Sequence, residues 1–164
     1  VLENVAMSAA LDSSTSLRSA QNDKSLSSLV CSELASVLSS SFALSIDMAH
    51  AEHPNFVQRH EPNHAPVLGG GVVLKMNSQK RYASDVFSNA RFKMLCEQNN
   101  VPCQTFVMRN DMPCGSTVGP AISASLGIPT VDIGAPMLSM HSIREMTSVA
   151  DHEKMTSLIF AFWK

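Results

Sequence analysis

The chain has 164 residues, of which 45% are hydrophobic and 16% are charged. This composition is that of a folded domain and excludes a disordered chain. A net charge of -2 offers no general attraction to nucleic acid or to an anionic membrane, and no apolar run approaches the roughly 20 residues that cross a bilayer. We therefore expect neither nucleic acid nor a membrane as a partner.

The predicted elements alternate between helices and short apolar strands. In chain order they are a helix over Lys24–Leu38, a strand over Phe42–Asp47, a loop over 54–70, a strand over Val72–Met76, a helix over Asp85–Gln98, a strand over Cys103–Met108, a loop over Arg109–Thr117, a helix over Val118–Leu126, a strand over Thr130–Ile133, and after a further loop a last helix that contains Met155, Leu158, Ile159 and Phe162. This alternation predicts an α/β sheet covered by helices on both faces. Residues 1–22 are rich in Ser and Ala and show no clear period.

Local signals predict how two of these helices begin and which side of one faces the core. Asn22 or Asp23 is a candidate N-cap for the first helix, and Ser84 for the helix over Asp85–Gln98. In the latter helix we predict an apolar side made of Val86, Phe87, Ala90, Met94 and Leu95. In the strand Val72–Met76, side-chain alternation places Val73 and Lys75 on one face. The strand pattern alone leaves open whether Lys75 is exposed.

The four cysteines, Cys31, Cys96, Cys103 and Cys114, form neither a Cys-x-x-Cys zinc knuckle nor a dense disulfide framework. A reduced, cytoplasmic protein is the expectation from this cysteine usage. The first residues contain no basic segment followed by a long apolar core, so no secretory signal is predicted. The chain starts with Val1, which favours a fragment or a processed product.

Three polar clusters follow predicted strands, at residues 47–53, 109–117 and 134–145. In α/β sheets, functional groups gather at the carboxyl ends of strands. Asp47, His50 and His53 offer the carboxylate oxygen and imidazole nitrogens that zinc binds, although an Asp at a strand end is at least as often a cap. His141 lies in a loop with Gly, Pro, Arg and Glu, where ligation has better odds than for an isolated histidine.

The middle cluster contains Gly115-Ser116-Thr117 at the start of a predicted helix. Backbone N–H groups in such a turn can hold a carboxylate or phosphate, and a well-capped helix start is the simpler interpretation. Cys114 has no base paired with it in the sequence, so a buried structural thiol is favoured over a nucleophile.

Taken together, the clusters resemble the aspartyl aminopeptidase family of dinuclear zinc peptidases. The resemblance rests on SIDMAHAEHPNF, VVLKMNSQKRYAS, VMRNDMPCGSTVGP and DIGAPMLSMHSIREM, in the family's order, and covers roughly residues 40–164. Residues 1–39 match only loosely. The resemblance implies a three-layer α/β/α sandwich of the zinc aminopeptidase type, here as a partial domain, and a large homo-oligomeric shell.

The resemblance also implies roles for individual residues. Asp47 matches a ligand of one zinc that lies next to substrate, and His141 matches a ligand of the other zinc. His50 and Tyr82 match substrate-contacting residues, and Lys75 matches the lysine that meets the substrate's acidic side chain. His53 is given only a role in shaping the site, and the Gly115-Ser116-Thr117 turn is expected to line it.

The family's remaining parts lie upstream of this region. They are a first His ligand, an Asp that bridges the metals, a Glu-Glu pair that supplies the general base and another ligand, and an inserted β domain. No Glu-Glu pair occurs in the 164 residues. A catalytic zinc usually has three protein ligands, and one per zinc is present here.

The favoured function is therefore zinc-dependent removal of N-terminal Asp or Glu from peptides, with two zinc ions per complete subunit. This chain would be an incomplete and inactive portion of that enzyme. Two alternatives remain: a non-catalytic truncated product that acts as an assembly or binding module, and a simple mononuclear metal-binding domain.

Overall fold

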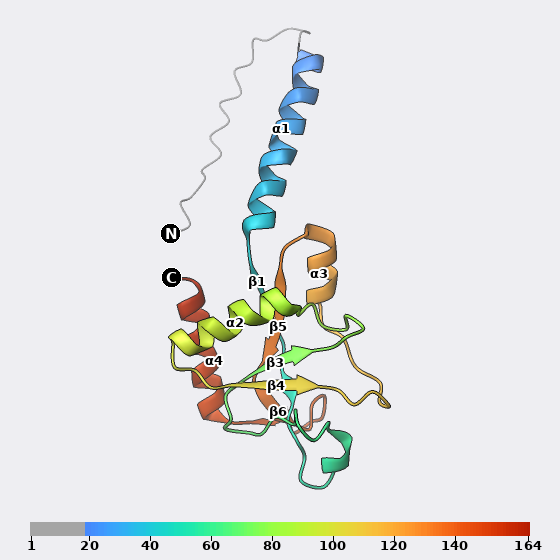
Figure 1. Cartoon of the computed structure of the whole chain (residues 1–164), viewed down its shortest axis with the longest axis vertical. Coiled ribbons are helices and arrows are strands. Elements are labelled where there is room, and N and C mark those ends of the chain that lie inside the picture. Colours follow the sequence, from blue (N-terminus) through green and yellow to red (C-terminus); the bar gives the residue numbers. More distant parts are fainter. Residues whose placement is uncertain (1–18) are drawn as a thin grey trace. The chain divides into compact units, whose positions relative to one another are not determined.

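The computed structural model describes residues 19–164 and the side chains from residue 30 onward. It divides into two units, residues up to Ser40 and Ser41–Lys164. In the first unit the described part is helix α1 (Ser19–Ser40) (Figure 1). The helix predicted over Lys24–Leu38 is confirmed, but Asn22 and Asp23 lie inside α1, so the prediction that either one caps it is wrong. Residues 1–18 of the Ser- and Ala-rich stretch lie outside the described residues.

The second unit alternates strands and helices along its length (Figure 1). In chain order its elements are β1 (Ala43–Ile46), β2 (Ala49–His50), the 3-10 helix η1 (Val57–Arg59), β3 (Val72–Met76), α2 (Val86–Gln98), β4 (Cys103–Val107), α3 (Gly119–Leu126), β5 (Thr130–Gly134), β6 (Pro136–Leu138), β7 (Met146–Thr147) and α4 (Val149–Phe162). All four predicted strands are present, as β1, β3, β4 and β5. β6 and β7 occupy part of what was predicted as a loop after residue 134, because their two or three residues are too short to show a period.

The central sheet has the strand order β1-β5-β3-β4. β1 and β5 are parallel and so are β3 and β4, whereas β3 and β5 are antiparallel. The short strands β2, β6 and β7 form a second sheet. The central sheet is therefore mixed, and β1 and β5 run in the direction opposite to β3 and β4.

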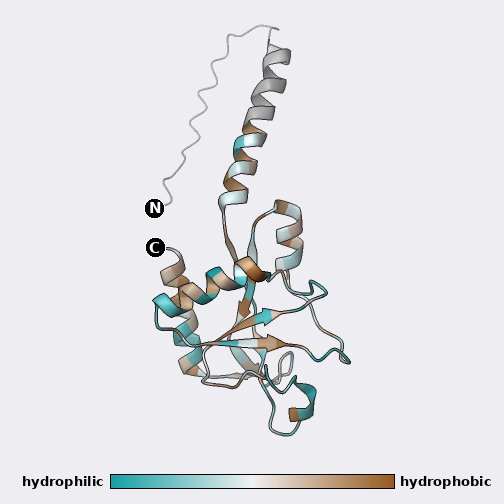
Figure 2. Cartoon of the chain, viewed as in Figure 1, coloured by the Kyte–Doolittle hydropathy of each residue, from teal (hydrophilic) through white to brown (hydrophobic). Residues whose placement is uncertain are grey.

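The two faces of the central sheet have different cores. One face is packed by α2 and α4, and its buried residues include Val72, Leu74, Phe92, Val131, Ile133, Met155 and Leu158. The opposite face carries a smaller cluster made of Ala49, Val73, Tyr82 and Phe106. Figure 2 shows hydrophobic residues concentrated in the strands, with hydrophilic ones in the loop that carries η1. The α/β class and the alternation along β3 are both confirmed.

The prediction for the inner side of α2 is wrong except for Leu95, which is partly buried and packs against the core. Val86 and Phe87 are 79% and 84% exposed, and the buried residues are Ser88, Phe92 and Cys96. These three residues are spaced i, i+4 and so lie on one side of α2. Because Ser and Cys are only weakly apolar, the hydrophobic pattern of the sequence favours the other, exposed side of the helix.

The predicted N-cap of α2 is also wrong, by one residue. Asp85 caps the helix, accepting a hydrogen bond from Ser88 N while Ser88 Oγ accepts one from Asp85 N. This reciprocal capping box satisfies two backbone donors. Ser84 instead is buried, and its Oγ accepts a hydrogen bond from Asp132 N at 2.9 Å.

Candidate functional site

Asp47 follows β1 and is placed by the end of β5. Its backbone N donates to Ile133 O at 3.0 Å. A Cβ atom added to Gly134 would lie 1.8 Å from the carbonyl oxygen of Asp47, so only glycine allows this close approach. The Asp47 side chain is 58% exposed. Its carboxylate is therefore presented to solvent from a fixed backbone.

Lys75 is a buried ammonium beside that carboxylate. The side chain leaves β3 on the same face as Val73 and is only 2% exposed, which decides the question that the strand pattern left open. Its Nζ lies 3.5 Å from Asp47 Oδ2, donates to the carbonyl oxygens of Asp47 and Met48 at 3.2 and 3.4 Å, and sits 5.3 Å from the centre of the Tyr82 ring. Burial lowers the pKa of Lys75, and Asp47 and Asp132 oppose that shift.

The five residues predicted for the site line one cavity of about 150 Å³, which we call the sheet-face cavity. They are Asp47, His50, Lys75, Tyr82 and His141, and the Gly115-Ser116-Thr117 turn completes the wall. Residues nearly 100 positions apart in sequence thus converge on one face of the sheet. His53 does not line this cavity and instead lines its neighbour.

Basic side chains surround His50. Burial lowers the pKa of His50, and His60, His141 and Lys75 lower it further, while Asp47 opposes the shift. Burial also raises the pKa of Tyr82, with a contribution from Cys114. The structure therefore favours a neutral imidazole and a neutral phenol beside the Lys75 ammonium.

His141 has an unusual backbone for a residue with a side chain. Its φ of 68° lies in the left-handed region, and Ser139, two residues earlier, has a φ of 58°. The backbone N of His141 donates to Glu145 Oε1 at 2.6 Å, which holds the turn. Such conformations cost roughly 1–3 kcal/mol each and are concentrated at functional sites. No sequence pattern had indicated this feature.

Asp132 is a positioning residue that sequence reasoning missed. It is fully buried on β5, where Thr117 Oγ1 donates to its Oδ1 at 2.6 Å and Ala83 N donates to its Oδ2. A Cβ on Gly119 would approach its carboxylate oxygens to 2.6 and 2.8 Å, so the start of α3 also packs against it. Asp132 thereby fixes both the Tyr82 segment and the Gly-Ser-Thr turn. An Asp inside the apolar run Thr130–Ile133 was the available signal.

Asp132→Ala is expected to destabilise the chain by roughly 2–5 kcal/mol, because it leaves the buried Ala83 amide and the half-buried Thr117 hydroxyl without their acceptor. The measurement is the free energy of unfolding in urea. Asp111→Ala removes an exposed ion pair with Arg109 and serves as the control, with an expected cost of about 0–1 kcal/mol. Equal losses in the two variants would contradict the role given to Asp132.

The mixed sheet changes how the site is assembled. The carboxyl ends of β1 and β5 lie at one edge, and that of β4 lies at the other, because β4 runs in the opposite direction. The segment after β4 nevertheless reaches the site, since Thr117 bonds to Asp132 and its N donates to Arg81 O at 3.4 Å. The three polar clusters follow strands as predicted, but these strands do not all end on the same side of the sheet. The clusters meet over a face of the sheet.

The donors in the sheet-face cavity fit part of a zinc site. Asp47 and His141 supply an exposed carboxylate and an exposed imidazole at the same cavity, both of which zinc binds. Among the side chains that the structure describes, from residue 30 onward, no group of three or more His, Cys, Asp or Glu converges as a metal site. Any zinc held here would therefore need further ligands.

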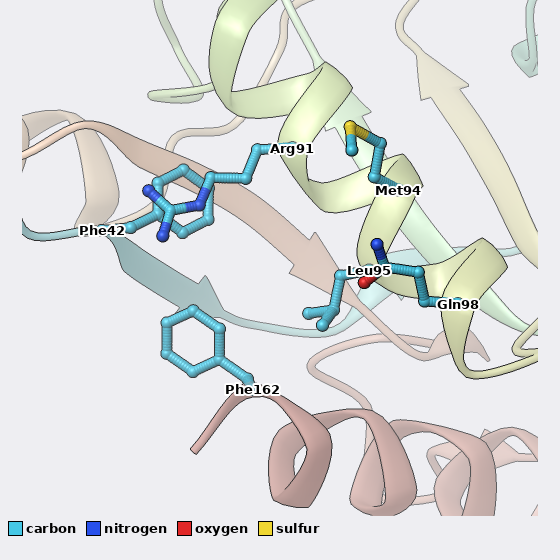
Figure 3. A pocket seen from close by; sticks show the side chains of 6 residues that line it. All are labelled: Phe42, Arg91, Met94, Leu95, Gln98 and Phe162. Atoms are coloured by element: carbon cyan, nitrogen blue, oxygen red, sulfur yellow. The ribbon is translucent and has the colours of Figure 1, made fainter. Parts of the chain in front are cut away.

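A separate cavity of about 220 Å³ lies where α2, α4 and the start of β1 meet (Figure 3). It is lined by Phe42, Arg91, Met94, Leu95, Gln98 and Phe162, of which only Arg91 is charged. The Arg91 guanidinium carbon lies 4.5 Å from the centre of the Phe42 ring. This cation–π contact occupies the one charged group, so the sheet-face cavity is the better candidate site.

Comparison with known protein families shows which family this chain belongs to. The family model described as aminopeptidase I zinc metalloprotease (M18) matches residues 9–163. The chain belongs to the M18 aminopeptidase family. The match begins well before residue 40 and thus includes α1.

Two curated relatives are identical to this chain at about half of the aligned positions. A probable aspartyl aminopeptidase of Ricinus communis is 52% identical over 118 residues, which are 72% of this chain and 24% of that protein. The aspartyl aminopeptidase of Dictyostelium discoideum is 50% identical over 127 residues, 77% of this chain and 26% of that protein. The chain thus spans about a quarter of the length of these relatives.

Solved M18 structures share the fold. The cryo-EM structure of the Ape4 and Nbr1 complex aligns with a TM-score of 0.79 at 43% identity, covering 80% of this chain and 25% of that one. The S. cerevisiae mApe1 dodecamer aligns with a TM-score of 0.72 at 30% identity, covering 84% and 32%. These matches confirm an M18 fold in partial form.

In the described part of the chain, no helix combines the length and apolar character needed to cross a membrane.

Proposed function

We propose that this chain is the C-terminal part of the catalytic domain of an aspartyl aminopeptidase, which removes N-terminal Asp or Glu from peptides. The observation that carries the proposal is the buried Lys75 ammonium, placed in one cavity with Asp47 and His141. The nearest carboxylate to this buried cation, that of Asp47, lies 3.5 Å away and is itself 58% exposed, which favours a second anion at Lys75. The acidic side chain of a substrate's first residue supplies that anion.

Each residue of the sheet-face cavity has a distinct task in this proposal. Lys75 binds the acidic side chain, and His50 and Tyr82 contact the substrate beside it. Asp47 holds one zinc ion and His141 the other, two ions per complete subunit. When bound, zinc polarises the scissile carbonyl and activates water. The buried contacts of Asp132 keep Tyr82 and the Gly-Ser-Thr turn in place around the substrate.

The remaining ligands and the general base belong to the complete enzyme, by which we mean a protein that joins this chain to those parts. We propose that the complete enzyme is a cytoplasmic homo-oligomer, since the similar S. cerevisiae mApe1 is a dodecamer. A non-catalytic assembly or binding module is the alternative, and the lack of a three-ligand group among the described residues favours it for this chain alone.

The test compares zinc-loaded chain and complete enzyme on a peptide with N-terminal Asp. We expect the complete enzyme to release Asp and the 164-residue chain to show no activity. General acid–base catalysis alone accelerates such reactions by roughly 10²–10⁴-fold, and the chain lacks the general base. Robust zinc-dependent turnover by the chain alone would show that the site assignment is wrong. A complete enzyme that cleaves no peptide with N-terminal Asp or Glu would favour the binding module.

A further inference from the structure

A second cavity adjoins the sheet-face cavity and is larger, about 370 Å³. We call it the methionine pocket after Met108, Met112, Met137 and Met140, which line it together with Ala51, Phe56 and Leu138. Its polar lining residues are His50, His53, Arg59, His60 and Ser139, and the Arg59 guanidinium carbon lies 5.1 Å from the centre of the Phe56 ring. The two cavities share His50, Met108 and Met140, so they are neighbours across a common wall. The volume lies within the range of about 300–1,000 Å³ that is typical of ligand pockets.

Three separate segments build this pocket, and Arg109 joins two of them. Its guanidinium forks onto the Asp111 carboxylate at 2.9 and 2.6 Å and also donates to Gln58 O in η1. Met112 N donates to Arg109 O at 3.1 Å. These bonds hold the loop with Met112 against the loop that carries Phe56. Two of the three segments that line the pocket are therefore held together.

One residue of the lining has a buried polar atom without a hydrogen-bond partner. His60 Nδ1 is buried and has no hydrogen-bond partner in the described part of the chain. The His60 ring packs edge-on to Phe106, with 6.2 Å between the ring centres. Buried polar atoms without a partner are uncommon, and each one calls for an explanation such as a bound group.

We propose that the methionine pocket receives the side chain of the substrate's second residue and favours a large apolar side chain there. The inference rests on the proposed function. With the first side chain at Lys75 and the bond to be cut beside Asp47 and His141, the second residue comes next, across the wall formed by His50. Unbranched, polarisable methionines adapt to apolar and aromatic side chains of different shape.

The experiment measures kcat/KM of the complete, zinc-loaded enzyme for Asp-Phe-Ala, Asp-Met-Ala and Asp-Gly-Ala. We expect a preference of roughly ten-fold or more for Phe and Met over Gly. Met112→Ala is expected to lower that ratio several-fold, and Met112→Leu, which keeps the volume, to retain most of it. Met94→Ala is the matched control, because Met94 lies on α2 at the other cavity and is 56% exposed. Its ratio should equal that of the unmodified enzyme.

The outcomes separate this inference from the function on which it rests. Cleavage of all three peptides with equal kcat/KM, or an unchanged ratio in Met112→Ala, overturns the inference and leaves the proposed function intact. Failure to cleave any of the three overturns both. A loss of preference in both Met112→Ala and Met112→Leu also counts against it, since a volume-conserving change should not remove an apolar pocket.

Discussion

Replacing Lys75 by Ala is expected to lower kcat/KM for substrates with N-terminal Asp or Glu by roughly 30- to 5,000-fold, and far less for those with Ala or Leu. Truncating one member of a buried charged pair typically costs about 2–5 kcal/mol. Lys75 is 2% exposed, so water cannot replace its ammonium next to the substrate carboxylate. The measurement is the ratio of kcat/KM between acidic and neutral substrates, at equal zinc content.

Two further variants make the Lys75 result specific. Lys75→Met keeps the side-chain length without the charge and should lose the same preference, which excludes a simple packing effect. Lys93→Ala removes an exposed lysine from α2 and should leave the ratio unchanged. Equal losses for acidic and neutral substrates would mean that Lys75 supports the fold or the chemistry and does not select the side chain.

Asp47→Ala and His141→Ala are each expected to lower zinc content toward one ion per subunit and to abolish peptidase activity in the complete enzyme. The two residues are assigned to different ions, and both ions are needed for the water and the carbonyl. Losing one of about three protein ligands is expected to weaken a catalytic zinc site strongly. Zinc per subunit, measured by elemental analysis after dialysis, reports this directly.

His152→Ala is the control for these metal variants, because His152 is an exposed histidine on α4. It should keep full zinc content and full activity. If Asp47→Ala and His141→Ala also keep two zinc ions per subunit, neither residue is a ligand, and the roles implied by the family resemblance are wrong for both.

Local sequence signals were sufficient for most of the fold. The apolar runs at Val72–Met76 and Thr130–Ile133 became β3 and β5, and alternation along β3 placed Val73 and Lys75 together as predicted. The predictions that were wrong depended on contacts between segments distant in the sequence. The inner side of α2 is set by packing on the sheet, and a stripe of Ser88, Phe92 and Cys96 is too weakly apolar to reveal that choice.

The directions of the strands decide which segments meet at the site, and the sequence pattern does not reveal them. Nothing in the residues of β3 and β5 distinguishes an antiparallel pair from a parallel one, yet that pairing brings the segment after β4 back over the sheet face. The same holds for Asp132, whose partners Ala83 and Thr117 are 49 and 15 positions away. The individual roles of Asp47, His50, Lys75, Tyr82 and His141 came from resemblance to a family and not from spacing.

The central claim is that this chain contributes one ligand to each of two zinc ions beside a pocket for an acidic side chain. The most direct measurement is a crystal structure of the complete enzyme with zinc, with the ions located by anomalous scattering at the zinc edge. We predict two ions at the sheet-face cavity, one bonded to Asp47 at about 2.0–2.2 Å and the other to His141 at about 2.0–2.1 Å. Zinc bound elsewhere, or a single ion that touches neither residue, would contradict the claim.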